Sequence, residues 1–149
     1  MRFLLPGLFL AAFCCGCSHN TSGLEDLNTQ VVTLPGGDQI RAEILIKPNE
    51  MSRGMMFRDA LPRGRGLLFI HNKPSPYRYW MYNVKVPLDI IFMDSNRRIV
   101  EISADTPPCT TKLSDCPTYG GHNYEQFVLE LGAGEARRLG LQKGQMLSF

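Results

Sequence analysis

The sequence predicts a mainly β domain, either a jelly-roll-like sandwich or a partly open barrel, of about eight short strands with one or two short helices. Apolar segments of strand length recur along the chain and are separated by turns rich in Gly, Pro, Asn and Asp. In residues 39–46, Ile40, Ala42, Ile44 and Ile46 alternate with mostly polar side chains, a pattern typical of a strand with one buried face. With 44% hydrophobic and 20% charged residues, the 149-residue composition excludes a disordered chain.

The first elements are a hairpin and a short helix. Residues 31–34 and 39–46 flank the turn Pro35-Gly36-Gly37-Asp38, whose glycines allow the positive φ that a tight turn requires. A helix is expected to begin near Pro48, because proline is tolerated in the first turn of a helix. Three methionines are expected to face inward from it: Met51, Met55 and Met56.

The rest of the chain predicts further strands and a second helix. The expected strands lie at residues 66–70, 77–84, 88–93, 98–104, 125–131 and 145–149. Asp94-Ser95-Asn96 is the turn between the third and fourth of these. Residues 132–139 are expected to form a short helix, because Ala, Glu and Arg favour one.

The N-terminus resembles a bacterial lipoprotein signal. Arg2 is followed by a short apolar stretch and then by small residues, the layout of a cleaved export signal. We expect residues 1–16 to be that signal, Cys17 to be the lipidated residue and 17–29 to be a polar tether. A single domain would then occupy 30–149, anchored by its lipid and exported to the bacterial envelope. Ser18 resembles the residue of lipoproteins sent to the outer membrane, so we expect the domain to face the periplasm.

Two cysteines remain outside the signal region, in a loop with three prolines. Cys109 and Cys116 are an even pair in an exported chain, which favours a disulfide. A redox-active pair usually has two intervening residues, and a zinc site needs partner ligands that the spacing does not supply. We therefore expect the bond to stiffen the loop.

Charge and motifs exclude several functions. Lys and Arg total 16 and Asp and Glu total 14, a net charge of +2, which argues against a general nucleic-acid binder. No run of 18 apolar residues indicates a membrane span. The sequence contains no HExxH, GxSxG, P-loop or GxGxxG motif, and its three histidines are far apart. We expect neither a metal nor another cofactor.

The candidate binding residues are arginines, an aromatic segment and one acid. Arg53 and Arg58 lie in a local cluster of arginines that can bind an anionic group or pair with nearby acids. Trp80 and Asn83 follow in a segment rich in large rings, which is either core or the lining of a ligand site. Asp89 begins an apolar strand, where it should meet an arginine or several backbone N–H groups. We expect these five side chains to line one concave patch, with Asp89 orienting Arg53 or Arg58.

Several ordered motifs occur from residue 31 onward. They are Arg53-Gly54-Met55-Met56-Phe57-Arg58, Gly66-Leu67-Leu68-Phe69, Trp80-Met81-Tyr82-Asn83, Pro87-Leu88-Asp89-Ile90-Ile91-Phe92, the loop from Pro108-Cys109 to Cys116 and Tyr119, and Val128-Leu129-Glu130 with Gly144. Together these motifs resemble the domain of unknown function 192 family, a group of uncharacterised and often exported proteins. Val84 departs from the family, in which Thr is common at this position. The resemblance implies a compact β-rich fold but no established reaction.

Three functions remain open. The first is a non-enzymatic envelope lipoprotein that binds a small or polymeric ligand, and the lack of a catalytic motif favours it. The second is an interaction or assembly module of an envelope complex. The third is an envelope hydrolase that uses Asp89 or Glu130 as acid or base, which would need two carboxyl groups about 5–9.5 Å apart.

Replacing Cys17 with Ser tests the lipid anchor. Without the thiol no lipid can be attached, so the protein should move from the membrane pellet to the soluble fraction. Fractionation followed by mass mapping of the mature N-terminus measures this. An unchanged membrane fraction would exclude lipidation at Cys17.

Overall fold

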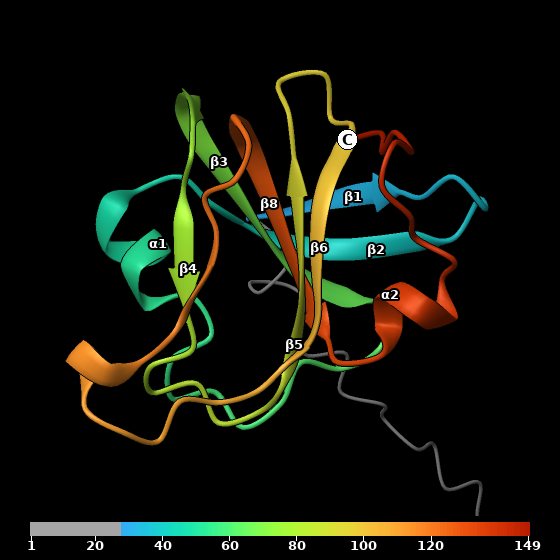
Figure 1. The fold of residues 1–149 in the computed structure, drawn as a ribbon. Coiled ribbons are helices and arrows are strands. Elements are labelled where there is room, and N and C mark those ends of the chain that lie inside the picture. The colour runs from blue at the N-terminus through green and yellow to red at the C-terminus, as the bar shows by residue number, and fades with distance from the viewer. Residues whose placement is uncertain (1–27) are drawn as a thin grey trace, which may run out of the picture.

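The computed structural model describes residues 28–149 and shows a mainly β domain, as the sequence predicts (Figure 1). The eight described strands form a six-stranded sheet and a two-stranded sheet, and the large sheet does not close into a barrel. The strands are β1 (Thr29–Thr33), β2 (Gln39–Leu45), β3 (Arg65–Ser75), β4 (Arg78–Trp80), β5 (Leu88–Met93), β6 (Ile99–Thr106), β7 (Thr118–Gly120) and β8 (Glu125–Gly132). The helices are α1 (Pro48–Arg53), α2 (Glu135–Arg138) and the 3₁₀ turn η1 (Leu113–Asp115).

Strand β8 lies inside the large sheet, whose order is β1-β2-β3-β8-β5-β6. It pairs antiparallel with β3 on one side and with β5 on the other. Only β2 and β3 pair in parallel among the described strands, and α1 lies on the connection between them. The short sheet of β4 and β7 lies beside α1, on one side of the large sheet, and α2 lies on the other (Figure 1).

Each face of the large sheet has its own core, because successive side chains of a strand point to opposite faces. On the α2 face, Leu68, Ile91 and Leu129 pack with residues of α2 and the C-terminal segment. On the α1 face, Phe69 and Val128 pack with side chains from α1, β4 and the loops around them. The two faces therefore bury different residues of the same three central strands.

The predicted N-terminal hairpin, the helix at Pro48 and most central strands are present. Two of the predicted strands, 77–84 and 145–149, differ from the structure. The segment 77–84 is a strand only at Arg78–Trp80, because Met81 then turns into the core and Asn83 adopts a left-handed φ of 58°. The segment 145–149 makes only isolated bridges, Thr33 with Ser148 and Arg98 with Met146. Thr33 lies in β1 and Arg98 precedes β6, so this segment crosses between the two edges of the sheet and cannot form a ladder along either.

Cys109 and Cys116 form the expected disulfide, with an S–S distance of 2.00 Å, in the loop that contains η1. No helix in residues 28–149 is long and apolar enough to cross a membrane. The predicted signal, Cys17 and most of the predicted tether lie outside the described residues.

Asp89 is fully buried on the α2 face, and its partners are backbone groups. Its Oδ1 accepts a hydrogen bond from the N–H of Asp105 at 2.7 Å, and its Oδ2 accepts one from the N–H of Ala136 at 2.7 Å. The expectation that Asp89 orients an arginine is therefore wrong, and the alternative of backbone N–H partners is confirmed. One carboxylate ties β5 to the end of β6 and to the start of α2.

Asp89→Asn should lower the free energy of unfolding by about 1–3 kcal/mol, because an amide can accept from only one of the two buried N–H groups. Chemical unfolding by urea measures the change. Asp59→Asn is the control, since Asp59 forms an exposed ion pair with Lys85 and should cost less than about 1 kcal/mol. Equal losses in the two variants would contradict the role assigned to Asp89.

Candidate functional site

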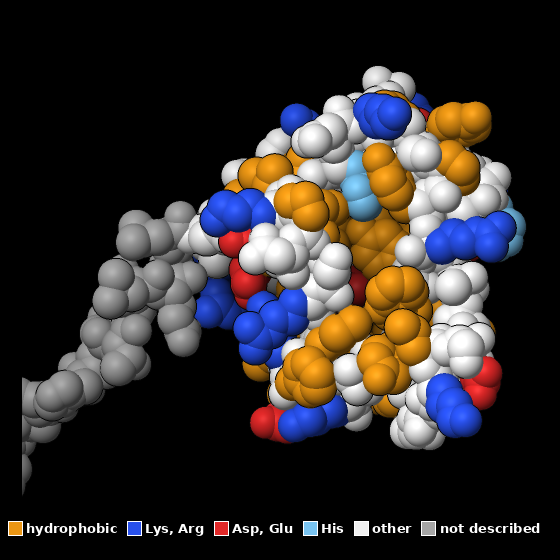
Figure 2. Space-filling model, turned by 90° about the vertical axis from the view of Figure 1, so that its left-hand side faces the viewer, with side chains coloured by type: hydrophobic (Ala, Val, Ile, Leu, Met, Phe, Trp, Pro, Cys, Tyr) orange, Lys and Arg blue, Asp and Glu red, His pale blue; other side chains and the backbone are white. Residues whose placement is uncertain are grey.

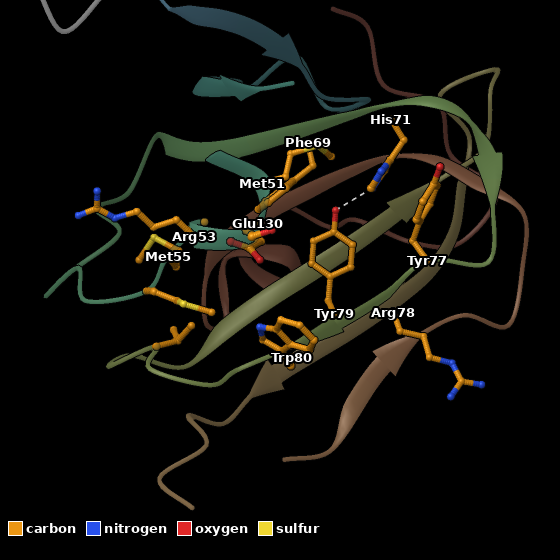
Figure 3. Close-up of a pocket in the computed structure, with 14 residues that line it drawn as sticks. Met51, Arg53, Met55, Phe69, His71, Tyr77, Arg78, Tyr79, Trp80 and Glu130 are labelled. Atoms are coloured by element: carbon orange, nitrogen blue, oxygen red, sulfur yellow. Dashed lines mark hydrogen bonds between the residues drawn. The ribbon is translucent and has the colours of Figure 1, made fainter. Parts of the chain in front are cut away.

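A cleft opens on the α1 face between the end of α1, strand β3 and strand β4, with β8 beneath it (Figure 3). We call it the α1–β4 cleft. Its volume is about 200 Å³, below the roughly 300–1,000 Å³ usual for drug-sized ligands. It is lined by Met51, Ser52, Arg53, Gly54, Met55, Met56, Phe69, His71, Tyr77, Arg78, Tyr79, Trp80, Val84 and Glu130.

Aromatic rings from β3 and the β4 region build one wall of the cleft. Tyr79 packs edge-on against Phe69, with ring centroids 5.1 Å apart, and its hydroxyl lies 3.0 Å from Nε2 of His71. The imidazole of His71 in turn stacks on Tyr77 at 3.5 Å. Burial lowers the pKa of His71 to about 4, so the imidazole is neutral at physiological pH. The rings of this wall therefore form one continuous packed surface.

Gly54 allows the opposite wall to approach Phe69. It ends α1 with φ at +40°, and a Cβ at this position would lie 3.1 Å from the Phe69 ring. A larger residue would strain the backbone and push against that ring. The turn after α1 then places Met55 in the core and Met56 at the side of the cleft.

Glu130 lies at the floor of the cleft. On β8 it pairs with Leu67 of β3 and Ile90 of β5, which places its side chain on the α1 face. It is 5% exposed, and its Oε2 has no hydrogen-bond partner within the described residues. Its carboxyl group points into the cleft between the walls (Figure 3).

The protonation of Glu130 follows from this burial. Removal from water raises the pKa of Glu130 to about 8, although the positive charge of Arg58 opposes the shift. Burial also raises the pKa of Tyr79, and the nearby Glu130 adds to that increase. At neutral pH Glu130, His71 and Tyr79 are therefore a neutral carboxylic acid, a neutral imidazole and a phenol.

Hydrophobic side chains surround the hollow on this face of the molecule, while Lys and Arg lie mostly toward its periphery (Figure 2). Trp80 is 44% exposed, so part of its ring is open to a ligand. The guanidinium groups of Arg53 and Arg78 extend away from the floor (Figure 3). The interior of the cleft is thus apolar apart from its floor and the His71–Tyr79 pair.

The structure brings only two of the five predicted binding residues into this cleft, Arg53 and Trp80. Arg58 instead forms two hydrogen bonds with the carboxylate of Glu43, at 2.6 and 3.0 Å, and both residues line a second cleft together with Arg41 and Arg65. Asn83 does not line the α1–β4 cleft, and its carbonyl accepts a hydrogen bond from the N–H of Phe57.

Asp89 lies on the opposite face of the sheet from Glu130. The pairing of Ile90 with Glu130 places those two on the α1 face, so Asp89, one residue earlier, points the other way. Glu101, on the neighbouring strand β6, contacts His122 and Asn123. No two of these three acids face each other across a cleft.

Within residues 28–149, no group of three or more His, Cys, Asp or Glu side chains is arranged to hold a metal ion. Among the described residues that line the cleft, Glu130 is the only carboxylate. The arrangement can therefore bind a small molecule, and Glu130 can give or take one proton there.

A family model for the domain of unknown function 192 (DUF192), described as uncharacterized, matches residues 31–149. The chain belongs to the DUF192 family. No curated protein matches it.

Two solved structures are similar to this DUF192 chain. A protein of unknown function from Novosphingobium aromaticivorans is 32% identical, with a TM-score of 0.74, and the match covers 88% of this chain and 90% of that one. A protein described as a proposed transcription regulator from Sinorhizobium meliloti is 27% identical, with a TM-score of 0.70, and the match covers 79% and 89%.

Sequence reasoning missed most of the cleft in this DUF192 domain. The sequence points to Glu130 only as a candidate acid or base, and it assigns none of Phe69, His71 and Tyr79 to a site. One signal was available, because Glu130 is a single acid inside the apolar run Val128-Leu129-Glu130-Leu131. An acid in the middle of a buried strand is costly unless it is paired or serves a function.

Glu130→Gln should stabilise the protein above about pH 5. An acid whose pKa is raised from 4.5 to about 8 on folding holds its proton only in the folded chain across that interval, so stability falls as pH rises through it. The accumulated loss is on the order of 3 kcal/mol at pH 7, and glutamine removes it. Unfolding measured near pH 4.5 and pH 7.5 should show a gain only at the higher pH.

Glu50→Gln is the matched control, because Glu50 lies on the surface of α1 in an ion pair with Lys47. Its unfolding free energy should change by less than about 1 kcal/mol at either pH. A Glu130→Gln variant that is destabilised equally at both pH values would show that the carboxyl has a partner and is not held neutral by burial.

Proposed function

We propose that this DUF192 chain is a non-enzymatic, ligand-binding lipoprotein of the bacterial envelope, and that the α1–β4 cleft takes the ligand. Glu130 carries the proposal. A buried carboxyl whose Oε2 has no partner lowers the stability of the fold, yet it sits at the floor of an apolar cleft. A ligand that supplies the missing hydrogen bond would offset that loss.

The segments that carry the family resemblance support the same cleft. Arg53 and Gly54 come from the first motif, Phe69 from the second, Trp80 from the third and Glu130 from the last. These motifs are far apart in the sequence, and the fold gathers them around one cavity. Their convergence is expected if the cavity is the functional part of the domain.

The proposed lipid at Cys17 would hold the domain at the membrane. The ten residues between Cys17 and Asn28 can extend to at most about 40 Å, so the domain would remain close to the lipid surface. A ligand of the periplasm or of the membrane interface is therefore within reach.

An assembly module is the second candidate, and exposed apolar side chains favour it. Phe57, which follows the cleft residue Met56, is 57% exposed, and Trp80, which lines the cleft, is 44% exposed. The hydrolase proposal has less support. A mechanism with two carboxylates needs a second acid, and Glu130 is the only carboxylate among the described residues that line the cleft.

Trp80→Leu should abolish retention of a small ligand. Protein isolated from envelopes is examined by native mass spectrometry, and the wild type should carry an added mass that the variant lacks, because the ring forms one side of the cleft. Phe57→Ala is the control, since Phe57 is exposed but does not line the cleft. A wild type without any bound small molecule, combined with loss of a protein partner in Phe57→Ala, would favour the assembly module.

A further inference from the structure

We propose that the ligand of the α1–β4 cleft is a small protonated amine with an apolar body, and that its N–H group pairs with the carboxylate of Glu130. This inference rests on the proposed binding function and names the chemical class of the ligand. It differs from one of the two alternatives that the sequence left open for the arginine cluster, which was the binding of an anionic group.

The charged groups around the floor favour a cation. Arg53 and Arg78 line the cleft but extend outward at its rim (Figure 3). Arg58 is held by Glu43 outside the cleft, and His71 is neutral beside Tyr79. The neighbouring strand β5 contributes only apolar side chains to the described core on this face near Glu130, namely Leu88 and Ile90. At the floor of the cleft, Glu130 is thus the one described lining residue that can carry a charge toward the ligand, and its ionised form is negative.

The walls suit an organic cation as well. The aromatic side chains of Phe69, Tyr79 and Trp80 line the cleft around Glu130, and the negative potential of an aromatic face attracts an ammonium group. The thioethers of Met51 and Met56 are polarizable and adapt to an apolar body. With about 200 Å³ available, that body is small.

The unsatisfied oxygen selects an amine that retains N–H groups. Oε2 of Glu130 lacks a hydrogen bond, which a primary or secondary ammonium can donate and a quaternary ammonium cannot. A carbonyl ligand, which offers only an acceptor, would be served by an amide side chain at this position, and so would an alcohol, whose hydroxyl can donate or accept. Glutamate is required where the floor must become an anion.

Binding then releases one proton. The empty cleft holds Glu130 as a carboxylic acid, and the ammonium enters with its charge. The proton of the carboxyl passes to solvent, and the carboxylate and ammonium form a buried ion pair. Because the pKa of Glu130 is about 8 in the empty cleft, the apparent Kd should rise about tenfold for each pH unit below that value and level off above it.

Benzylamine tests the inference, with benzyl alcohol as its neutral counterpart and benzoate as its anionic one. Trp80 is the only tryptophan in the chain and lines the cleft, so its fluorescence reports occupancy without a label. At about pH 8.5 benzylamine should bind at least about tenfold more tightly than either analogue. Calorimetry in two buffers of different ionisation enthalpy should show release of one proton near pH 7.

Glu130→Gln should lose both the preference for benzylamine and the pH dependence. Glu125→Gln is the matched control, because Glu125 is also a buried acid of β8 with an unpartnered oxygen but does not line the cleft. It should leave both properties unchanged.

The outcomes separate this inference from the proposed function. If benzyl alcohol or benzoate binds as well as benzylamine, or if Glu130→Gln keeps the amine, the ligand class is wrong and the cleft remains a binding site. If an endogenous ligand is retained and benzylamine does not compete for it, the ligand class is again wrong. If no probe changes Trp80 fluorescence and no endogenous ligand is retained, both proposals fail.

Discussion

The alternation of side chains along β8 is the constraint on which the rest of the structure depends. This strand is paired on both edges, with β3 and with β5, so every side chain must face one core or the other. Leu129 and Leu131 contribute to the core on the α2 face, and Val128 contributes to the core on the α1 face. Glu130 follows the same alternation, which fixes a carboxyl in the apolar layer on the α1 face.

The layer over the α1 face determines what this carboxyl can do. Opposite it the chain places α1, a turn that requires Gly54, and the short strand β4, instead of another long apolar element. These pieces are too short to cover the sheet completely, and a cleft remains above Glu130. On the other face, α2 and the C-terminal segment seal the core, and the buried acid there, Asp89, has a backbone N–H for each oxygen. The two buried acids, on neighbouring strands, therefore have different surroundings. Asp89 is covered by packed elements and hydrogen-bonded through both oxygens, whereas Glu130 lies below an open cleft and its Oε2 has no partner among the described residues.

Local signals in the sequence were sufficient for the elements but not for their assembly. The hairpin turn at Pro35-Gly36-Gly37-Asp38 and the apolar run of β5 depend on residues close in sequence, and both were predicted. The paths of residues 81–84 and 145–149 depend on long-range contacts, such as the hydrogen bond from the N–H of Cys109 to the carbonyl of Met81. Local patterns in the sequence do not reveal such contacts, and both segments were wrongly predicted as strands. For the site, Asp89 and Asn83 are near each other in sequence, but the strand alternation sends Asp89 to the far face. The pairing of Arg58 with Glu43 could not be predicted, because Glu43 lies fifteen residues away on β2 and only the fold brings the two side chains together. Without that partner, Arg58 was expected to belong to the binding patch.

Glu130 also links stability to function. A leucine or glutamine at this position would suit the apolar layer better, because either would remove the need to keep a proton on a buried acid. Sites that bind or react commonly hold such unfavourable groups, and their replacement commonly stabilises a protein while impairing its activity. An arginine placed against the acid would remove the same strain, and Arg58 is near enough to influence its pKa, yet Arg58 is held by Glu43. The geometry therefore keeps the carboxyl unpaired in the empty protein, which leaves its full hydrogen-bonding and charge-pairing capacity for whatever enters the cleft.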